Sequence, residues 1–372
     1  MRRGNASSSS RAEPPPSTSM PRYEPHYVTA STLRRSGHTH TSIPYCSMLK
    51  TGVKDVDELL GGGLRTGMVT ELCGEAGSGK THFALQCCFA AQRNETDGGL
   101  NARALYICSE TYPAKLVARM AQAKTANTES ASEAAVAMTD DIIVAHMLHE
   151  SADELVRTLA RAETLMDAHR TSAGRHMRDG GVCDDRKVRR VRLVVVDSIA
   201  SLFRTNDIGG ESGKRWNELY RVARMLKELA HKHDAVVLVV NQVTDVMSPA
   251  ADHDEGKRNT NGANGLDDGD NKNATTTTTT DTEQRRGRRV VQEENVSLAA
   301  SGHFTSMGRK LVPALGPSWA GFVNCRLVIS LRTNYGGGAG GVRRQLAVAF
   351  APHLPNDVVD FVVTESGVAC GT

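Results

Sequence analysis

The octapeptide Gly74-Glu75-Ala76-Gly77-Ser78-Gly79-Lys80-Thr81 decides how this sequence folds. It fits the pattern G-x-x-x-x-G-K-[ST], the loop that cradles nucleotide phosphates. Its glycines let backbone N–H groups converge on a phosphate, where a Cβ would obstruct them. Lys80 can then reach the β- and γ-phosphate oxygens, and the Thr81 hydroxyl can ligate Mg²⁺. The pattern predicts a binding site for a nucleoside triphosphate with Mg²⁺.

The residues on either side of the loop favour this interpretation over an ordinary glycine-rich turn. The apolar run 68–73 (MVTELC) leads into the loop, and residues 81–92 (THFALQCCFAAQ) continue as a helix with few breakers. Strand, glycine loop and helix is the order that the chemistry requires, because the helix N-terminus adds its partial positive charge at the phosphates.

Composition limits how much of the chain belongs to a packed core. The chain has 372 residues and a net charge of +3, so bulk electrostatics do not indicate a polyanionic partner. Residues 1–44 are rich in Ser, Pro, Thr and Arg, and residues 248–302 are polar with a threonine run, so we expect both to be disordered. Together with a basic insert at about 170–190, this leaves roughly 250 residues, enough for a single core within 45–372.

Cysteine usage and hydropathy indicate the redox compartment of the protein and whether it associates with a membrane. The eight cysteines are scattered and lack metal-ligand spacing, which favours a reducing compartment without structural zinc. No apolar run approaches the ~20 residues that span a bilayer, so we expect no membrane partner. Whether residues 1–26 carry a targeting signal stays open, because the arginines among the serines are followed by three prolines.

The hydrophobic pattern after the loop predicts an α/β fold. Apolar runs predict strands at 103–108, 142–145, 191–197, 235–240, 323–331, 345–350 and 358–363. Helical spacing is found at 113–124, 153–168 and 214–233. Strands that alternate with helices are typical of parallel sheets, and the last three runs have no long helix between them. We expect a mostly parallel twisted sheet with helices on both faces and a small antiparallel C-terminal extension.

Three polar residues follow predicted strands at the sheet edge where open α/β sheets bind ligands. Asp197 fits the role of a carboxylate that holds Mg²⁺, although a strand-ending Asp can also cap the next helix. Glu110 can orient or deprotonate the attacking water, or be a solvated loop carboxylate. Gln242, with Asn241 before it, can sense the γ-phosphate, or be an ordinary loop amide.

These segments together resemble a known family. GEAGSGKT (74–81), ALYICSE (104–110), VRLVVVDSIASLFR (191–204) and VVLVVNQVTDVM (236–247) are similar to the RecA-type ATPase core of eukaryotic homologous-recombination proteins. Residues 313–327, 351–355 and 364–368 further resemble a recombinase paralogue. The resemblance covers about residues 51–372 without the inserts. It implies a RecA-type P-loop core that uses ATP and Mg²⁺, with Lys80, Thr81, Glu110, Asp197 and Gln242 in the nucleotide roles given above.

The resemblance also implies DNA contacts in two loops, at about 205–215 and 248–311. The basic candidates are Lys214 and Arg215 in the first loop, and Arg309, Lys310 and the arginines of 285–289 in or beside the second. Such residues contact phosphates of single-stranded or branched DNA without reading its sequence. The run at 285–289 can equally be a solvated charge run or a nuclear-import signal. Phe304 is the only ring in the second loop, so base stacking has little support.

The N-terminal segment implies partners of the same family. Tyr27 and Ala30 match the aromatic-x-x-Ala pattern with which recombinase protomers add a strand to a neighbour's sheet edge. Residues 1–26 are too short and polar for the compact helical domain of the main recombinases. Phe350 stands where active recombinases carry an Asp that caps ATP across the protomer interface, which favours small hetero-complexes over long filaments.

We therefore expect a nuclear recombinase paralogue that binds DNA, acts in homologous-recombination repair of double-strand breaks and hydrolyses ATP slowly within a hetero-complex. The alternatives are an ATP-binding assembly adaptor without meaningful hydrolysis, and a strand-exchange recombinase that forms its own filaments.

Overall fold

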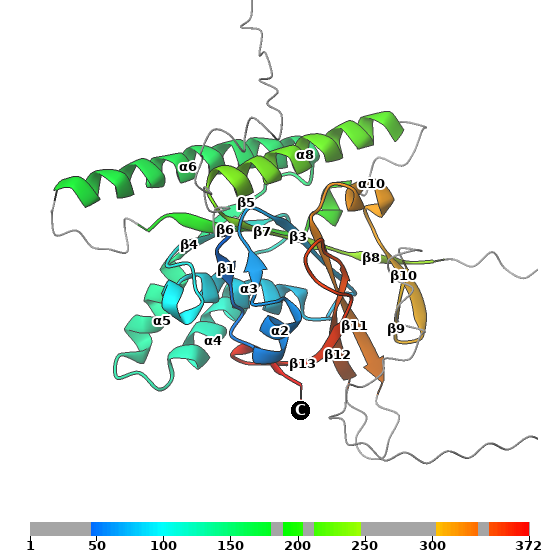
Figure 1. Ribbon diagram of the computed structural model, residues 1–372, viewed down its shortest axis with the longest axis horizontal. Helices are drawn as coiled ribbons and strands as arrows, with labels where there is room; N and C mark the ends of the chain where they lie inside the picture. Colours follow the sequence, from blue (N-terminus) through cyan, green and yellow to red (C-terminus); the bar gives the residue numbers. More distant parts are fainter. Residues whose placement is uncertain (1–45, 180–188, 204–211, 247–302, 334–341, 372) are drawn as a thin grey trace, which may run out of the picture. The chain divides into compact units, whose positions relative to one another are not determined.

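A nine-stranded sheet lies at the centre of the chain as the computed structural model describes it, over residues 46–179, 189–203, 212–246, 303–333 and 342–371 (Figure 1). The strand order is β14-β13-β12-β11-β3-β7-β6-β4-β5. The strands are Val69–Gly74 (β3), Arg103–Cys108 (β4), Ile142–His146 (β5), Val191–Asp197 (β6), Val236–Asn241 (β7), Cys325–Thr333 (β11), Val342–Phe350 (β12), Val358–Thr364 (β13) and Gly367–Cys370 (β14). The predicted segment 1–44 with Tyr27 and Ala30, and the insert 248–302, lie outside these residues.

The pairing confirms the predicted fold class. β11, β3, β7, β6, β4 and β5 pair in parallel, and β12, β13 and β14 continue the sheet with antiparallel pairs. All six residues of β7 are buried, as are the first six of β6, because both strands lie inside the sheet with both faces covered. The chain therefore has the mixed α/β core that its apolar runs predict.

Helices cover both faces of the sheet (Figure 1). The alternation along β6 shows how: Leu193 and Val195 pack with α2, α3, α4 and α5, whereas Val194 and Val196 pack with α6, α8 and α10. The helices are Lys54–Leu59 (α2), Lys80–Ala91 (α3), Ala114–Thr125 (α4), Ala131–Asp140 (α5), Ala152–Asp179 (α6), Ser212–Lys232 (α8) and Gly316–Ala320 (α10), with short 3-10 turns at Glu95–Asp97 (η1) and Ala200–Phe203 (η2). No described helix is long and apolar enough to cross a bilayer.

Two small sheets complete the described part of the chain. Met48–Leu49 (β1) pairs with Leu64–Arg65 (β2). Val243–Asp245 (β8), Phe304–Ser306 (β9) and Arg309–Pro313 (β10) form an antiparallel sheet in the order β8-β10-β9. Because β8 begins directly after β7 and Gln242, this small sheet starts where the central strand β7 ends.

Helix α6, the strands β9 and β10, and the side chain of Phe304 differ from what the sequence predicts. The helix α6 runs to Asp179, so it occupies the first part of the expected 170–190 insert; residues 171–179 contain no proline to end it. β9 and β10 lie in the final part of the region expected to be a loop as far as residue 311. Phe304 is buried at 5% exposure beside Leu311, so its ring cannot stack on a base.

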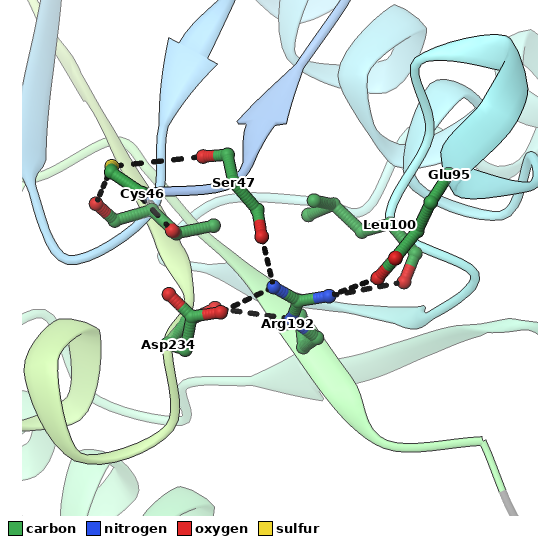
Figure 2. Close-up of polar contacts among 7 residues, drawn as sticks. Cys46, Ser47, Glu95, Leu100, Arg192 and Asp234 are labelled. Carbon is green, nitrogen blue, oxygen red and sulfur yellow. Dashed lines mark hydrogen bonds and ion pairs between the residues drawn. The ribbon is translucent and has the colours of Figure 1, made fainter. Parts of the chain in front are cut away.

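A buried guanidinium joins three segments at the other end of the parallel strands (Figure 2). Arg192, near the start of β6, donates to the Ser47 hydroxyl at 3.0 Å and to the Glu95 carboxylate at 2.8 Å. It also donates to the carboxylate and, at 3.2 Å, to the carbonyl of Asp234 in the turn before β7. The start of β1, the turn after α3 and the α8–β7 turn are thus held by one side chain.

Candidate nucleotide-binding site

The phosphate loop has the geometry that its sequence predicts, between β3 and α3. Gly77 and Gly79 have φ angles of 74° and 107°, which side chains with a Cβ rarely adopt. A Cβ on Gly74 would lie 2.8 Å from the carbonyl oxygen of Ile329. The Ser78 hydroxyl is buried without a hydrogen-bond partner in the described part of the chain. The loop therefore fits a phosphate group, with the N-terminus of a twelve-residue helix behind it.

The Lys80 ammonium lies across the mouth of the loop. Its Nζ donates to the carbonyl oxygens of Gly74 at 2.8 Å and Glu75 at 2.7 Å. Burial lowers the pKa of Lys80, and the charges of Asp197, Cys73 and Glu110 act in the opposite direction. Within the described part of the chain these carbonyl oxygens are its hydrogen-bond acceptors, and an ammonium in such a half-buried site is suited to receive phosphate oxygens.

Asp197 ends β6 beside the first turn of α3. Its Oδ2 accepts hydrogen bonds from the Thr81 hydroxyl at 3.0 Å and the Tyr106 hydroxyl at 2.5 Å. Burial and the Asp197 charge raise the pKa of Tyr106, so the phenol keeps its proton and remains a donor. Thr81 and Asp197 are thus together, as predicted, and a hydroxyl beside a carboxylate suits a hard cation such as Mg²⁺. Tyr106 was missed, because its place inside an apolar strand reads as core.

Glu110 follows the neighbouring strand β4. It is exposed, and its charge acts to raise the pKa of Lys80. Ser109 fixes the backbone beside it: its Oγ donates to the Ser198 carbonyl at 3.0 Å and accepts from the Ser201 hydroxyl at 2.8 Å. Glu110 and Asp197 therefore come from adjacent strand ends whose spacing is set by these serines.

Asn241 and Gln242 end β7 next to the start of the phosphate loop. Asn241 is paired in register with Cys73, the residue before Gly74. Its side chain is fully buried and donates to the Glu71 carboxylate at 2.6 Å. The carbonyl of Gln242 accepts a hydrogen bond from the Ala314 N–H at 2.9 Å. Gln242 is thus held at the point where the main sheet passes into β8.

Arg344 is a basic group near the loop that sequence reasoning missed. It lies on β12, with its Cδ 3.8 Å from the position of a Cβ on Gly79. Burial lowers the pKa of His82, in the first turn of α3, and the Arg119 and Arg344 charges lower it further. Arg344 is therefore a second basic residue close to the phosphate loop, besides Lys80. Only the fold could reveal Arg344, since β12 is far along the chain.

The predicted DNA-contact residues lie on two elements. Lys214 and Arg215 are in the first turn of α8, and Lys214 is exposed. Arg309 and Lys310 are exposed at the start of β10. Arg309 is paired within the chain, with Glu75 and with Asp245, the latter at 3.2 Å. The arginines of 285–289 lie outside the described residues.

Two rings beside Lys214 and Arg215 are more exposed than the helical pattern predicts. Trp216 and Tyr220 are 47% and 45% exposed, although their spacing places them on the apolar side of α8. Their ring planes differ by 5° and their centroids lie 5.4 Å apart. Helical spacing predicts which side of a helix is apolar, but not how far neighbouring elements cover that side.

The fold and the site define a RecA-type P-loop ATPase domain. The Rad51 family model matches residues 45–172 and 182–268, so the chain belongs to the Rad51 family. It is 25% identical over 352 residues to a DNA repair protein XRCC3 homolog of Arabidopsis thaliana, covering 90% of this chain and 95% of that protein.

Further relatives agree with this assignment. The chain is 28% identical to DNA repair protein XRCC3 of Mus musculus, over 86% of this chain and 74% of that protein. It is 31% identical to DNA repair and recombination protein RadA of Cenarchaeum symbiosum (strain A), over 53% of this chain and 43% of that protein. The similarity of residues 313–327, 351–355 and 364–368 to XRCC3 proteins (X-ray repair cross-complementing protein three) indicated the same relatives, and the comparison confirms it.

Proposed function

We propose that this protein is an ATP-dependent, DNA-binding recombinase paralogue in homologous-recombination repair of double-strand breaks. The observation that carries the proposal is the hydrogen bond between Thr81 of the phosphate loop and Asp197 of β6, because these are the two side chains that we propose to hold Mg²⁺ beside ATP. The relatives named for DNA repair support the biological setting. A nuclear location follows from that setting.

Each residue of the site has a role in hydrolysis. Bound Mg²⁺ would neutralise charge on the phosphates, and Thr81 and Asp197 are the residues that would hold it. Lys80 binds the β- and γ-phosphate oxygens. Glu110 orients the attacking water and accepts its proton, and Gln242 hydrogen-bonds the γ-phosphate or that water. Apart from the proton transfer to Glu110, these groups act by positioning and charge stabilisation, and we propose slow turnover that is linked to DNA.

DNA is bound through its phosphates. Lys214 and Arg215 lie on α8 after the strand that carries Asp197, and Arg309 and Lys310 lie on β10 beside the strand that follows Gln242. Basic groups on elements that leave the strands of the nucleotide site can change their contacts with nucleotide state. We propose single-stranded or branched DNA as the ligand, bound without sequence preference.

Other recombinase-family subunits are the proposed protein partners. Phe350 ends β12 where the family resemblance places a nucleotide-capping Asp, and its ring lies 5.3 Å from the Arg326 guanidinium. An aromatic ring cannot accept the hydrogen bonds of a nucleotide in a neighbouring protomer. This favours a hetero-complex over a filament of this chain alone.

The test is ATP hydrolysis by the purified chain, alone and with single-stranded DNA. Glu110→Gln is the matched control, since it keeps the size of the side chain and removes the base. We expect DNA to stimulate ATP hydrolysis by the unmodified chain. We expect the hydrolysis rate of Glu110→Gln to be at least about 100-fold lower. ATP binding without any DNA effect would contradict the proposal and favour an assembly adaptor.

A pair of lysine variants separates hydrolysis from binding. Lys80→Arg keeps a cation at the phosphates but alters its reach, whereas Lys80→Ala removes the cation. If hydrolysis is required, both variants should fail to complement repair-deficient cells. If only the bound nucleotide stabilises a partner interface, Lys80→Arg should complement as long as it binds ATP in a filter-binding assay, and the adaptor function would replace the proposed one.

A further inference from the structure

Glu75 connects the phosphate loop to a different element. Glu75 is buried, with 9% of the residue exposed. One carboxylate oxygen accepts a hydrogen bond from the Ser306 hydroxyl at the end of β9, and the other accepts one from the guanidinium of Arg309 at the start of β10. Both arms of the β9–β10 hairpin therefore bind a single side chain of the loop.

The hairpin is also seated firmly against the main sheet. Its turn residue Met307 donates its N–H to the Leu331 carbonyl at 2.8 Å, and the Leu331 N–H donates to the Ser306 hydroxyl at 2.8 Å. Phe304 and Leu311 pack against Cys73, the residue that precedes the phosphate loop. With its base fixed in this way, the hairpin can transmit a displacement of Glu75 rather than absorb it.

The hairpin also contacts the segment around Gln242, the residue proposed to sense the γ-phosphate. Arg309 binds Asp245 of β8 with both carboxylate oxygens at 3.2 Å. β8 begins directly after Gln242, and the Ala314 N–H after β10 donates to the Gln242 carbonyl at 2.9 Å. The loop, the hairpin and the sensor thus form one continuous set of contacts.

Lys80 shows how a nucleotide would act on Glu75. Its ammonium donates to the Glu75 carbonyl at 2.7 Å. If Lys80 binds the phosphates of a triphosphate, its ammonium would have to give up this hydrogen bond to the Glu75 carbonyl. We propose that Glu75 is a positioning residue that transmits occupancy of the phosphate loop to the β8–β10–β9 sheet through Ser306 and Arg309.

The consequence for DNA rests on the proposed function. Arg309 has 53% of its side chain exposed while it binds Glu75 and Asp245, so a DNA phosphate can approach the same guanidinium. DNA and nucleotide then act on one ion pair from opposite sides. Since coupling between two sites is reciprocal, each ligand must change the affinity of the other by the same factor.

Hydrogen exchange without DNA tests the transmission itself. A non-hydrolysable ATP analogue is added to the full chain, and amide exchange is followed over residues 304–313. We expect a change of about five-fold or more, the lower end of usual site-to-site coupling, and its loss in Glu75→Gln and in Arg309→Gln. If nucleotide-bound wild type shows no change, or both variants keep it, the inference is overturned. Having two variants protects the test against one that fails to fold.

DNA affinity, measured with and without the analogue, tests the coupling. Lys310→Gln is the matched control, because Lys310 is the exposed neighbour of Arg309 on the same strand. The ratio of the two affinities should fall toward one in Glu75→Gln and Arg309→Gln, with the double variant no worse than either single. Lys310→Gln should weaken DNA binding equally in both states and keep the ratio. A ratio that survives in the Glu75 and Arg309 variants overturns the inference and leaves the proposed function intact. A chain that binds no DNA but keeps the exchange effect overturns the proposed function alone.

Discussion

Asp197 depends on a hydroxyl that is not part of any nucleotide motif. The Tyr106 ring is 1% exposed and its hydroxyl donates to Asp197 at 2.5 Å. Tyr106→Phe keeps the packing and removes one donor from a charged acceptor, which costs about 1.5–3 kcal/mol. We expect the free energy of unfolding in urea to fall by that amount. We also expect a higher Mg²⁺ concentration for half-maximal ATP binding, because the carboxylate is held by Thr81 alone.

Tyr112 supplies the control for that substitution. Its ring packs edge-on against Tyr106 at 5.6 Å, and its hydroxyl makes no hydrogen bond within the described part of the chain. Tyr112→Phe should change neither the stability nor the Mg²⁺ requirement. Equal effects of the two substitutions would contradict an orienting role for Tyr106.

Glu71 is a second residue whose effect on stability depends on its partners. Glu71 is 0% exposed and binds Arg326 at 2.6 Å and Asn241 at 2.6 Å. Removing one member of a buried ion pair leaves an uncompensated charge and costs about 3–5 kcal/mol, whereas replacing both by apolar groups costs far less. Glu71→Leu should therefore unfold at much lower urea than the double variant Glu71→Leu, Arg326→Met. If the double variant is as unstable as the single one, the loss of stability comes from losing the ion pair and not from the unpaired, buried guanidinium.

At the scale of elements, Arg192 differs from the Glu71–Arg326 pair, because among the charged groups of this network only the arginine is buried (Figure 2). Arg192 is buried, but its partners Glu95 and Asp234 have side chains that are 65% and 54% exposed. In Arg192→Met the two carboxylates return to water, so the unfolding free energy should fall by only about 1 kcal/mol. In the double variant Glu95→Gln, Asp234→Asn the guanidinium stays buried without a counter-charge, and the loss should reach about 3 kcal/mol. Urea denaturation of the two variants measures the difference, and equal losses would contradict it.

The elements that the sequence predicts well are those with a local signal. β6 and β7 are continuous apolar runs, and α3 follows a motif that fixes its first turn, so their positions and the meeting of Lys80, Thr81 and Asp197 could be predicted. The β8-β10-β9 sheet could not, because its strands are short and β8 pairs with β10 across the 248–302 insert. For the same reason Glu75 could be assigned to the phosphate loop but not to Arg309, whose partner is set by tertiary packing alone.

At the scale of the whole molecule, the central sheet has an open edge that can accept a partner strand. β5 is the last strand on one side and pairs only with β4 among the described strands. Val136 on α5, Val144 on β5 and Leu148 just after it are 57%, 39% and 80% exposed. An unpaired strand edge with exposed apolar side chains is where an extended segment can dock by adding a strand. We therefore predict that a partner subunit of the proposed hetero-complex docks on this edge.

A charge on that edge should prevent assembly without unfolding the chain. Val144→Asp places a carboxylate where a docking strand would bury it, and unpaired burial of a charge is costly. When this chain is co-expressed with each recombinase-family subunit of the same organism, we expect Val144→Asp to lose at least 90% of the co-purified partner, about the ten-fold that 1.4 kcal/mol produces. ATP binding and the urea midpoint should stay unchanged, because the Val144 side chain is 39% exposed at the edge of the sheet and β4 separates its strand from β6, which carries Asp197. Tyr27→Ala tests the reverse arrangement, in which this chain's own segment docks on its partner. If partners co-purify undiminished with both variants, neither the β5 edge nor the Tyr27 segment holds the complex together.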